Sequence, residues 1–103
     1  MKIVRVQYTT TAAYAPINKQ NIANVTREVR ELNHTGIKYS TYLLPDGKTF
    51  IHFDQFENEE AHQLLQSLES FKKFAAELEA SSLEAEPKLE LLELVASTED
   101  FWG

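Results

Sequence analysis

The chain has 103 residues, of which 43% are hydrophobic and 25% are charged, and these values are ordinary for one globular domain. Ten basic residues against sixteen acidic residues give a net charge of −6, which argues against nucleic acid and anionic membrane as partners. The absence of cysteine excludes disulfides and thiolate chemistry. No apolar run approaches the ~20 residues of a membrane span, and the first residues lack the apolar core of a signal peptide. We therefore expect a cytoplasmic protein with a single domain over residues 1–103.

The first half of the chain predicts a strand, a helix and a hairpin. Residues 2–10 alternate apolar and polar side chains and are rich in β-branched residues, which indicates a strand. Apolar residues then recur at three- and four-residue steps, which predicts an amphipathic helix over about residues 18–33. Gly36 is placed to end that helix. Two extended runs flank the Pro-Asp-Gly sequence at residues 45–47, whose residue types favour a tight hairpin turn.

The second half predicts one long helix and a last strand. Asn58 is placed to cap the helix, and the two glutamates that follow it complement the positive end of the helix dipole. An apolar stripe of about five turns then predicts one continuous helix. The stripe consists of Ala61, Leu64, Leu65, Leu68, Phe71, Ala75 and Leu78. Residues 88–97 are predicted to form the last strand, and a short aromatic tail follows them. For Trp102 in that tail we consider three alternatives: it closes a pocket, it docks on a partner subunit, or it lies in a frayed end.

This order of elements is the βαββαβ order of a ferredoxin-like α+β fold, with a four-stranded antiparallel sheet and two helices on one face. Two helices cover one face only, yet both arms of the predicted hairpin and the last strand carry apolar residues on both sides. In the last strand, for example, Leu89 and Leu91 alternate with Leu92 and Leu94. The economical cover for the second face is another copy of the chain, so we expect a homodimer through sheet-to-sheet packing. A monomer with irregular strand ends is the alternative.

Two stretches of the sequence resemble a known family. "FIHFDQFENEEA", at residues 50–61, resembles the aromatic–acidic–x–aromatic strand end that leads into an acidic helix start in antibiotic biosynthesis monooxygenase (ABM)-like proteins of the dimeric α/β-barrel superfamily. "SFKKFAAEL", at residues 70–78, is similar to the phenylalanine-rich middle of that family's second helix. The resemblance implies a dimeric α/β barrel and a cofactor-independent monooxygenase, an oxidoreductase acting on a small aromatic or quinone-like compound. It also implies that neither a cofactor nor a metal is needed.

Another branch of this superfamily degrades haem. That branch uses an asparagine on the first strand, a tryptophan near the end of the third strand and a histidine on the second helix. The matching positions here are Gln7 or Tyr8, Phe56 and Gln66. Because Gln66 cannot ligate iron as an imidazole does, the sequence argues against haem degradation.

His52, Asp54 and His62 are the candidate catalytic residues. His52 and Asp54 share one face of the predicted third strand, where the carboxylate would orient the imidazole as a general base. The alternative is a hydrogen-bonded polar cluster without chemistry. Gln7 lies on the neighbouring first strand and is expected to converge on the same place. His62, on the second helix, is either a pocket residue or part of a solvated flank, and the spacing of these residues matches no standard zinc site.

Amide and aromatic side chains are the candidates for substrate binding. They are Gln7, Tyr8, Tyr39, Phe53, Phe56 and Gln66. An enclosed pocket of roughly 300 Å³ or more that meets a histidine would favour the enzyme. A packed interior that leaves both His52 and His62 in solvent would favour the alternative function, a non-catalytic dimeric ligand-binding or structural module of the same fold.

Overall fold

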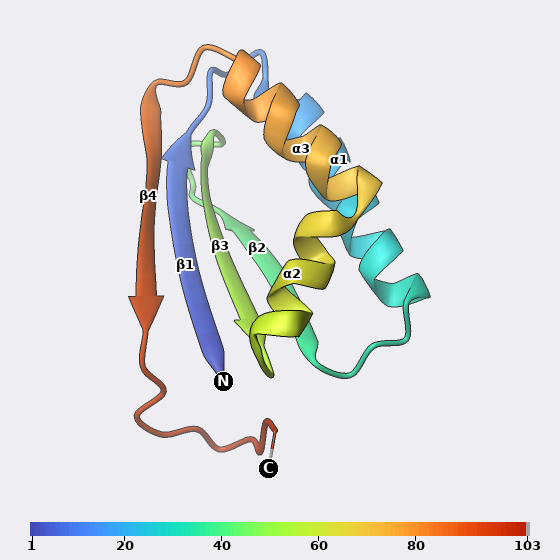
Figure 1. Cartoon of the computed structure of the whole chain (residues 1–103). Helices are drawn as coiled ribbons and strands as arrows, with labels where there is room; N and C mark the ends of the chain where they lie inside the picture. Colours follow the sequence, from blue (N-terminus) through green and yellow to red (C-terminus); the bar gives the residue numbers. More distant parts are fainter. Residues whose placement is uncertain (103) are drawn as a thin grey trace.

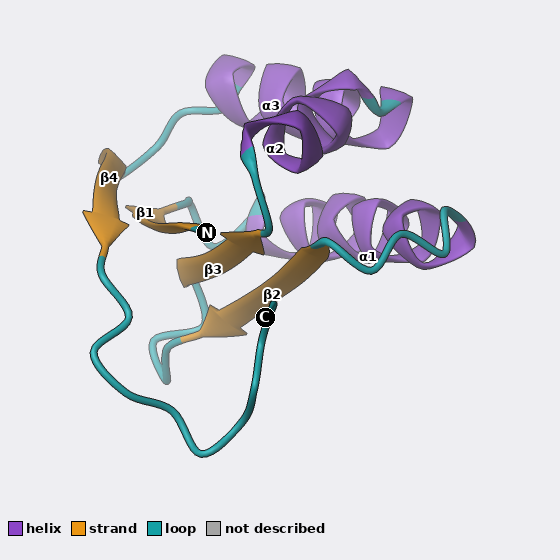
Figure 2. Ribbon diagram, turned by 60° about the horizontal axis from the view of Figure 1, so that its bottom comes forward, coloured by secondary structure: helices purple, strands orange, loops and turns teal. Residues whose placement is uncertain are grey.

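The computed structural model describes residues 1–102, and its elements follow the predicted order except that the second helix is divided in two. The elements are β1 (Lys2–Thr9), α1 (Ala15–Glu31), β2 (Ile37–Leu43), β3 (Thr49–Phe56), α2 (Glu59–Ser67), α3 (Glu69–Ala80) and β4 (Ala85–Leu92). The strands form one sheet in the order β2-β3-β1-β4, and every neighbouring pair is antiparallel. All three helices lie on one side of this sheet (Figures 1 and 2). The ferredoxin-like α+β fold predicted from the sequence is therefore confirmed.

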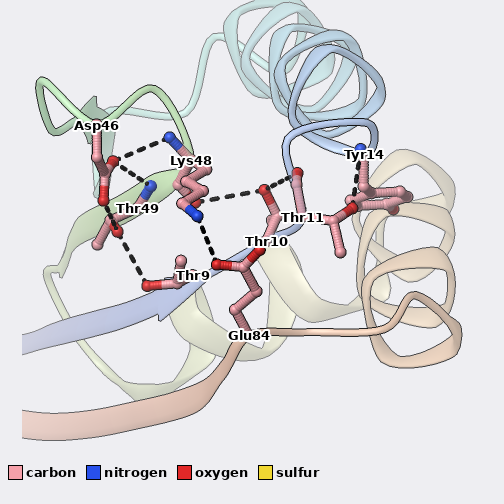
Figure 3. A network of polar contacts seen from close by, with 8 residues as sticks. All are labelled: Thr9, Thr10, Thr11, Tyr14, Asp46, Lys48, Thr49 and Glu84. Atoms are coloured by element: carbon pink, nitrogen blue, oxygen red, sulfur yellow. Dashed lines mark hydrogen bonds and ion pairs between the residues drawn. The ribbon is translucent and has the colours of Figure 1, made fainter.

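A polar network at one end of the sheet fixes the turn between β2 and β3 (Figure 3). Asp46 Oδ1 accepts hydrogen bonds from the backbone N–H groups of Lys48 and Thr49, both at 2.9 Å. The Thr49 hydroxyl donates to Asp46 Oδ2 at 2.5 Å and lies 2.9 Å from the hydroxyl of Thr9 on β1. Lys48 Nζ lies 2.6 Å from Glu84 Oε1, just before β4. The predicted hairpin is therefore confirmed, and its turn is bonded to the end of β1 and to the residue that precedes β4.

Leu68 interrupts the predicted second helix. Its ψ of 137° is extended, so α2 ends there and α3 begins there. This extended residue resets the helical phase, and Phe74 is buried in place of Ala75, which is exposed. The prediction of one continuous apolar stripe through Ala75 is therefore wrong. The predicted cap of α2 is confirmed, because the side chain of Asn58 accepts a hydrogen bond from the backbone N–H of Ala61 at 2.9 Å.

The ends of α1 also differ from the prediction. The helix begins at Ala15, with proline in its first turn, and extends to Glu31. Asn33, with a φ of 52°, takes the left-handed conformation that we assigned to Gly36. Gly36 instead lies where a Cβ atom would come within 2.8 Å of His34 Cε1, so a larger residue there would have to displace the exposed side chains of His34 and Glu57.

The last strand is displaced towards the N-terminus relative to the predicted residues 88–97. It begins at Ala85 and includes Pro87, which is tolerated because β4 is an edge strand. It ends at Leu92, which pairs with Ile3 near the start of β1. Residues after Leu92 have no further length of β1 beside them, and the strand stops for that reason.

The two faces of the sheet differ in character. The face towards the helices contains the buried side chains Val4, Tyr8, Phe50, His52, Asp54 and Phe56. On the open face, Arg5 bonds to Glu90 Oε1 at 3.0 Å and to Gln7 Oε1 at 2.7 Å. Apolar side chains flank this polar centre, among them Ile51 and Phe53. The open face is thus apolar at its flanks, as expected from the hairpin and the last strand, and polar at the centre of β1, for which only one apolar face was predicted.

After β4 the chain curves past the ends of the strands and returns beside β2, away from the helices (Figures 1 and 2). Trp102 Nε1 donates a hydrogen bond to the backbone carbonyl of Thr35 at 2.7 Å. Lys38 Nζ lies 5.5 Å from the ring centre of Phe101 and 5.6 Å from that of Trp102. The tail therefore docks on its own subunit. None of the helices within residues 1–102 combines the length and the hydrophobicity that a membrane crossing needs.

Candidate active site

A pocket of about 360 Å³ opens between α3 and the sheet. Its floor is formed by Val6 and Tyr8 of β1 and by His52 and Asp54 of β3. Val6 pairs with His52 across the two strands, and side chains two residues apart on a strand share a face. The alternation of β1 and β3 therefore brings all four side chains to the side of the sheet that faces the helices.

Aromatic and aliphatic side chains of α3 form the wall of the pocket. Phe71, Phe74 and Leu78 face the floor, and the Phe74 ring centre lies 5.4 Å from that of His52. The exposed residues that line the pocket define its mouth, and they are Ala75 and Glu79 of α3 and Glu86 and Pro87 of β4. A largely apolar enclosure of this volume with a few polar groups suits a small organic molecule.

His52 lies at the centre of a hydrogen-bond chain that crosses the sheet. Its Nε2 atom lies 2.7 Å from the Tyr8 hydroxyl, and its Nδ1 atom lies 3.1 Å from Thr41 Oγ1 and 3.4 Å from the Tyr39 hydroxyl. Asn18 of α1 donates from Nδ2 to the Tyr8 oxygen at 2.9 Å. Burial lowers the pKa of His52 to about 4, so the ring is neutral at physiological pH with both nitrogens occupied.

Asp54 is buried beside His52 but takes no part in this chain of hydrogen bonds. Its side chain is 8% exposed, and within residues 1–102 its Oδ1 atom has no hydrogen-bond partner. Burial raises the pKa of Asp54 from 3.8 to about 7. The predicted hydrogen bond between Asp54 and His52 is absent from the described residues, because His52 bonds instead to the hydroxyls of β1 and β2. The idea that Asp54 orients His52 is therefore wrong.

Gln7 and Phe53 do not reach the pocket. Gln7 pairs with Ile51, and Phe53 pairs with Arg5, so both lie on the open face of the sheet. The predicted convergence of Gln7 on His52 is therefore wrong. The error lies in the choice of face, since Tyr8, the next residue along β1, does meet His52.

Of the remaining predicted residues, Tyr39 contacts His52, whereas His62, Phe56 and Gln66 lie outside the pocket. Tyr39 contacts His52 from β2. His62 stacks on Phe56 with ring centres 4.4 Å apart, and burial lowers the pKa of this histidine; neither residue lines the pocket. Gln66 is exposed on α2, whereas Phe56 is fully buried, so the positions that match the haem-degrading branch do not form one site.

Several residues of the site were not predicted from the sequence, and two of them, Asn18 and Phe74, show why. Asn18 is fully buried, and it precedes Ile22 by four positions and Val25 by seven, which places it on the apolar stripe of α1. A polar residue on that stripe was the available signal. Phe74 faces the pocket because of the interruption at Leu68, and neither glycine nor proline marks that interruption in the sequence.

Comparisons with solved structures agree with the fold described above. The chain is similar to a crystal structure of an antibiotic biosynthesis monooxygenase, at 13% identity and a TM-score of 0.78, over 93% of this chain and 100% of the other. It is similar to Rv0793 from Mycobacterium tuberculosis at 12% identity and a TM-score of 0.77, over 95% and 98% of the two chains. It is similar to PA3566 from Pseudomonas aeruginosa at 20% identity and a TM-score of 0.75, over 92% and 94%. No protein-family model matches the sequence, and no curated protein matches it. The chain thus has the ABM-like ferredoxin fold.

Proposed function

We propose that this protein is a cofactor-independent monooxygenase that acts on a small aromatic hydroxy compound or quinol in the pocket beneath α3. The observation that carries the proposal is Asp54, a buried carboxyl with a free oxygen atom in an apolar pocket. The likeness of the fold to an antibiotic biosynthesis monooxygenase supports the same reaction class. The pocket also meets His52, the feature that distinguishes the enzyme from a packed, non-catalytic module.

Asp54 acts as the general base in this proposal. A base is most effective when its pKa is close to the working pH, and the pKa of Asp54 is raised to about 7. The carboxylate takes a proton from the substrate, and the resulting anion is electron-rich enough to react with O₂ directly. His52 is unsuited to this role, because its pKa is lowered and both of its ring nitrogens are engaged.

Tyr8 stabilises the substrate anion. When the His52 proton is on Nε2, both His52 and Asn18 donate to the Tyr8 oxygen. The Tyr8 proton is then free to point into the pocket, where it donates to the oxygen atom on which negative charge develops. His52 and Asn18 are positioning residues in this arrangement.

The reaction balances without an external reductant. The carbon attacked is the ring CH₂ group of an anthrone, or the CH₂ group that a quinol has in its keto tautomer. One atom of O₂ becomes the new carbonyl oxygen there, and the other leaves as water with the two hydrogens. The substrate supplies all four electrons. Asp54 removes the first proton and returns it to the departing oxygen.

Oxygen uptake tests the proposal. A hydroxyanthrone and a naphthoquinol are supplied as substrates, and O₂ consumption is followed together with the absorbance of the oxidised product. Asp54→Asn should lower kcat/KM by about 10²-fold or more, as expected for loss of a general base. Asp100→Asn is the matched control, because Asp100 is exposed in the tail. Wild-type protein that leaves the spontaneous oxidation rate of both compounds unchanged would contradict the proposal.

We also propose that two copies of the chain pair through the open faces of their sheets. Tyr42 is 58% exposed and Leu92 is 38% exposed at the flanks of that face, and Val95 beyond β4 is 93% exposed. Exposed apolar side chains on both flanks of one sheet face favour association on a small protein, and the polar centre between them can pair with its counterpart. A two-fold axis would bring the same side chains of both copies together.

A further inference from the structure

We infer that the pocket selects an aromatic compound that offers a hydrogen-bond donor to Asp54 and carries no carboxylate, sulfate or phosphate. The inference rests on the proposed function only in that it concerns the same pocket. It adds to the proposed aromatic hydroxy compounds the condition that the ligand carries no negative charge, and it admits cationic aromatic amines as further ligands.

The charged side chains around the pocket are all acidic. Asp54 lies on the floor, Glu79 of α3 lies at the mouth, and Glu86 of β4 faces it. Among the described residues that line the pocket there is no lysine and no arginine. The two lysines of α3 are directed to other acidic groups: Lys72 Nζ lies 3.6 Å from Glu69 and Lys73 Nζ lies 4.0 Å from Glu77.

An anionic ligand would be penalised most strongly by Asp54. The surroundings of its carboxyl are apolar, so a second negative charge nearby is weakly screened and lacks a compensating cation. An anionic ligand would therefore enter in one of two ways. Either Asp54 takes up a proton, or the ligand binds against the repulsion between the two anions. The glutamates at the mouth are exposed, so their repulsion is weaker, is reduced by salt and acts during the approach of the ligand.

The same carboxyl favours a donor group on the ligand. Asp54 Oδ1 is buried without a partner, and a buried carboxylate oxygen gains most from a hydroxyl or an ammonium group. The apolar wall of Phe71, Phe74 and Leu78 holds the aromatic body of the ligand against this floor. Recognition thus combines a ring, one donor and the absence of negative charge.

Three ligands of nearly equal shape test the inference by binding alone: 2-naphthol, 2-naphthoate and 2-naphthylmethylammonium. Their dissociation constants are measured by calorimetry or by NMR titration at about pH 8.5, where Asp54, whose pKa is raised to about 7, is ionised. We expect the naphthol and the ammonium compound to bind at least about tenfold more tightly than the naphthoate, a difference of about 1.4 kcal/mol. Naphthoate binding as tightly as naphthol, or no binding of any of the three ligands, would overturn the inference.

Two variants locate the source of the discrimination. Asp54→Asn should strengthen naphthoate binding and bring it within about threefold of naphthol. Glu79→Gln/Glu86→Gln, at two exposed positions where folding is not at risk, should strengthen naphthoate binding by a smaller factor and leave naphthol unchanged. Glu60→Gln/Glu93→Gln is the matched control, since both residues are exposed and neither lines the pocket. A naphthoate affinity that neither test variant alters would refute the inference.

The outcome is separable from that of the oxygen-uptake test. Turnover of a quinol by a protein without charge preference would refute this inference and leave the enzyme in place. A clear preference for uncharged ligands without turnover would refute the oxygenase and leave the inference in place.

Discussion

The hydroxyl of Tyr8 lies 2.7 Å from Nε2 of His52, and this contact joins the two central strands at the floor of the pocket. Both side chains are almost fully buried, and Asn18 bonds to the same hydroxyl from α1. A helix and two strands therefore meet at one oxygen atom. Any ligand in the pocket lies against a floor whose polar groups are already held in place.

Removal of this oxygen atom should be costly. Tyr8→Phe leaves a buried donor of Asn18 and a ring nitrogen of His52 without a partner, and we expect a loss of about 1–3 kcal/mol in the free energy of unfolding in urea. Tyr42→Phe is the matched control, because Tyr42 is exposed, and it should change stability by less than about 0.5 kcal/mol. Equal effects of the two substitutions would show that the buried network does not stabilise the fold.

The pH dependence of stability should separate Asp54 from His52. The folded state raises the pKa of Asp54 from 3.8 to about 7, so it binds more protons than the unfolded chain in this range, and the contribution of Asp54 to stability falls as pH rises. The folded state lowers the pKa of His52 from 6.5 to about 4, so the contribution of His52 rises with pH in that window. In the wild-type protein the two residues therefore change the free energy of unfolding with pH in opposite directions.

Asp54→Asn removes the decrease in stability with rising pH that Asp54 causes. Relative to wild type, this variant should gain up to about 1.4 kcal/mol of stability per pH unit between about pH 4.5 and 6.5. Urea unfolding at several pH values measures the difference. Parallel stability curves for the variant and the wild type would mean that Asp54 titrates alike in the folded and unfolded states.

Ala75 offers a way to fill the pocket without disturbing the core. It lines the pocket from α3 and is exposed, so Ala75→Leu should place a larger side chain at the mouth and weaken naphthol binding by about tenfold or more. The free energy of unfolding should change by less than about 0.5 kcal/mol. Ala76→Leu is the control at the next exposed position, which does not line the pocket. The same loss of affinity in both variants would place the ligand elsewhere.

The oligomeric state tests the pairing of the open faces. We expect light scattering with size-exclusion chromatography to give the mass of two chains for the wild type and of one chain for Leu92→Glu, whose charge would be buried between the sheets. Ile17→Glu replaces a half-exposed residue of α1 and should leave the dimer intact. A wild-type monomer at micromolar concentration would reject the pairing.

The sequence was sufficient for the order of the elements, because each element carries a strong local signal. The hairpin at Asp46 and the helix cap at Asn58 are formed by side chains that bond to backbone within three residues. Such contacts depend little on the rest of the fold. They were predictable for that reason.

The candidate site was less predictable, because its contacts join distant parts of the chain. His52 and Asp54 were found as polar residues in an apolar strand, but their partners depend on which face of β3 meets the helices. The alternation on β1 fits either face, and Gln7 was therefore chosen together with Tyr8 although only Tyr8 reaches the pocket. The break at Leu68, which brings Phe74 to the pocket, is a matter of backbone conformation that no residue type signals.

The titration of the Asp54 carboxyl tests the central claim most directly. Protein labelled with ¹³C at the aspartate carboxyl groups is followed by NMR across the pH range, with Asp54→Asn to identify the resonance. We expect a pKa of about 7 for Asp54 and a change of this pKa when 2-naphthol binds. A midpoint near the ordinary aspartate value of 3.8 that the ligand leaves unchanged would contradict it.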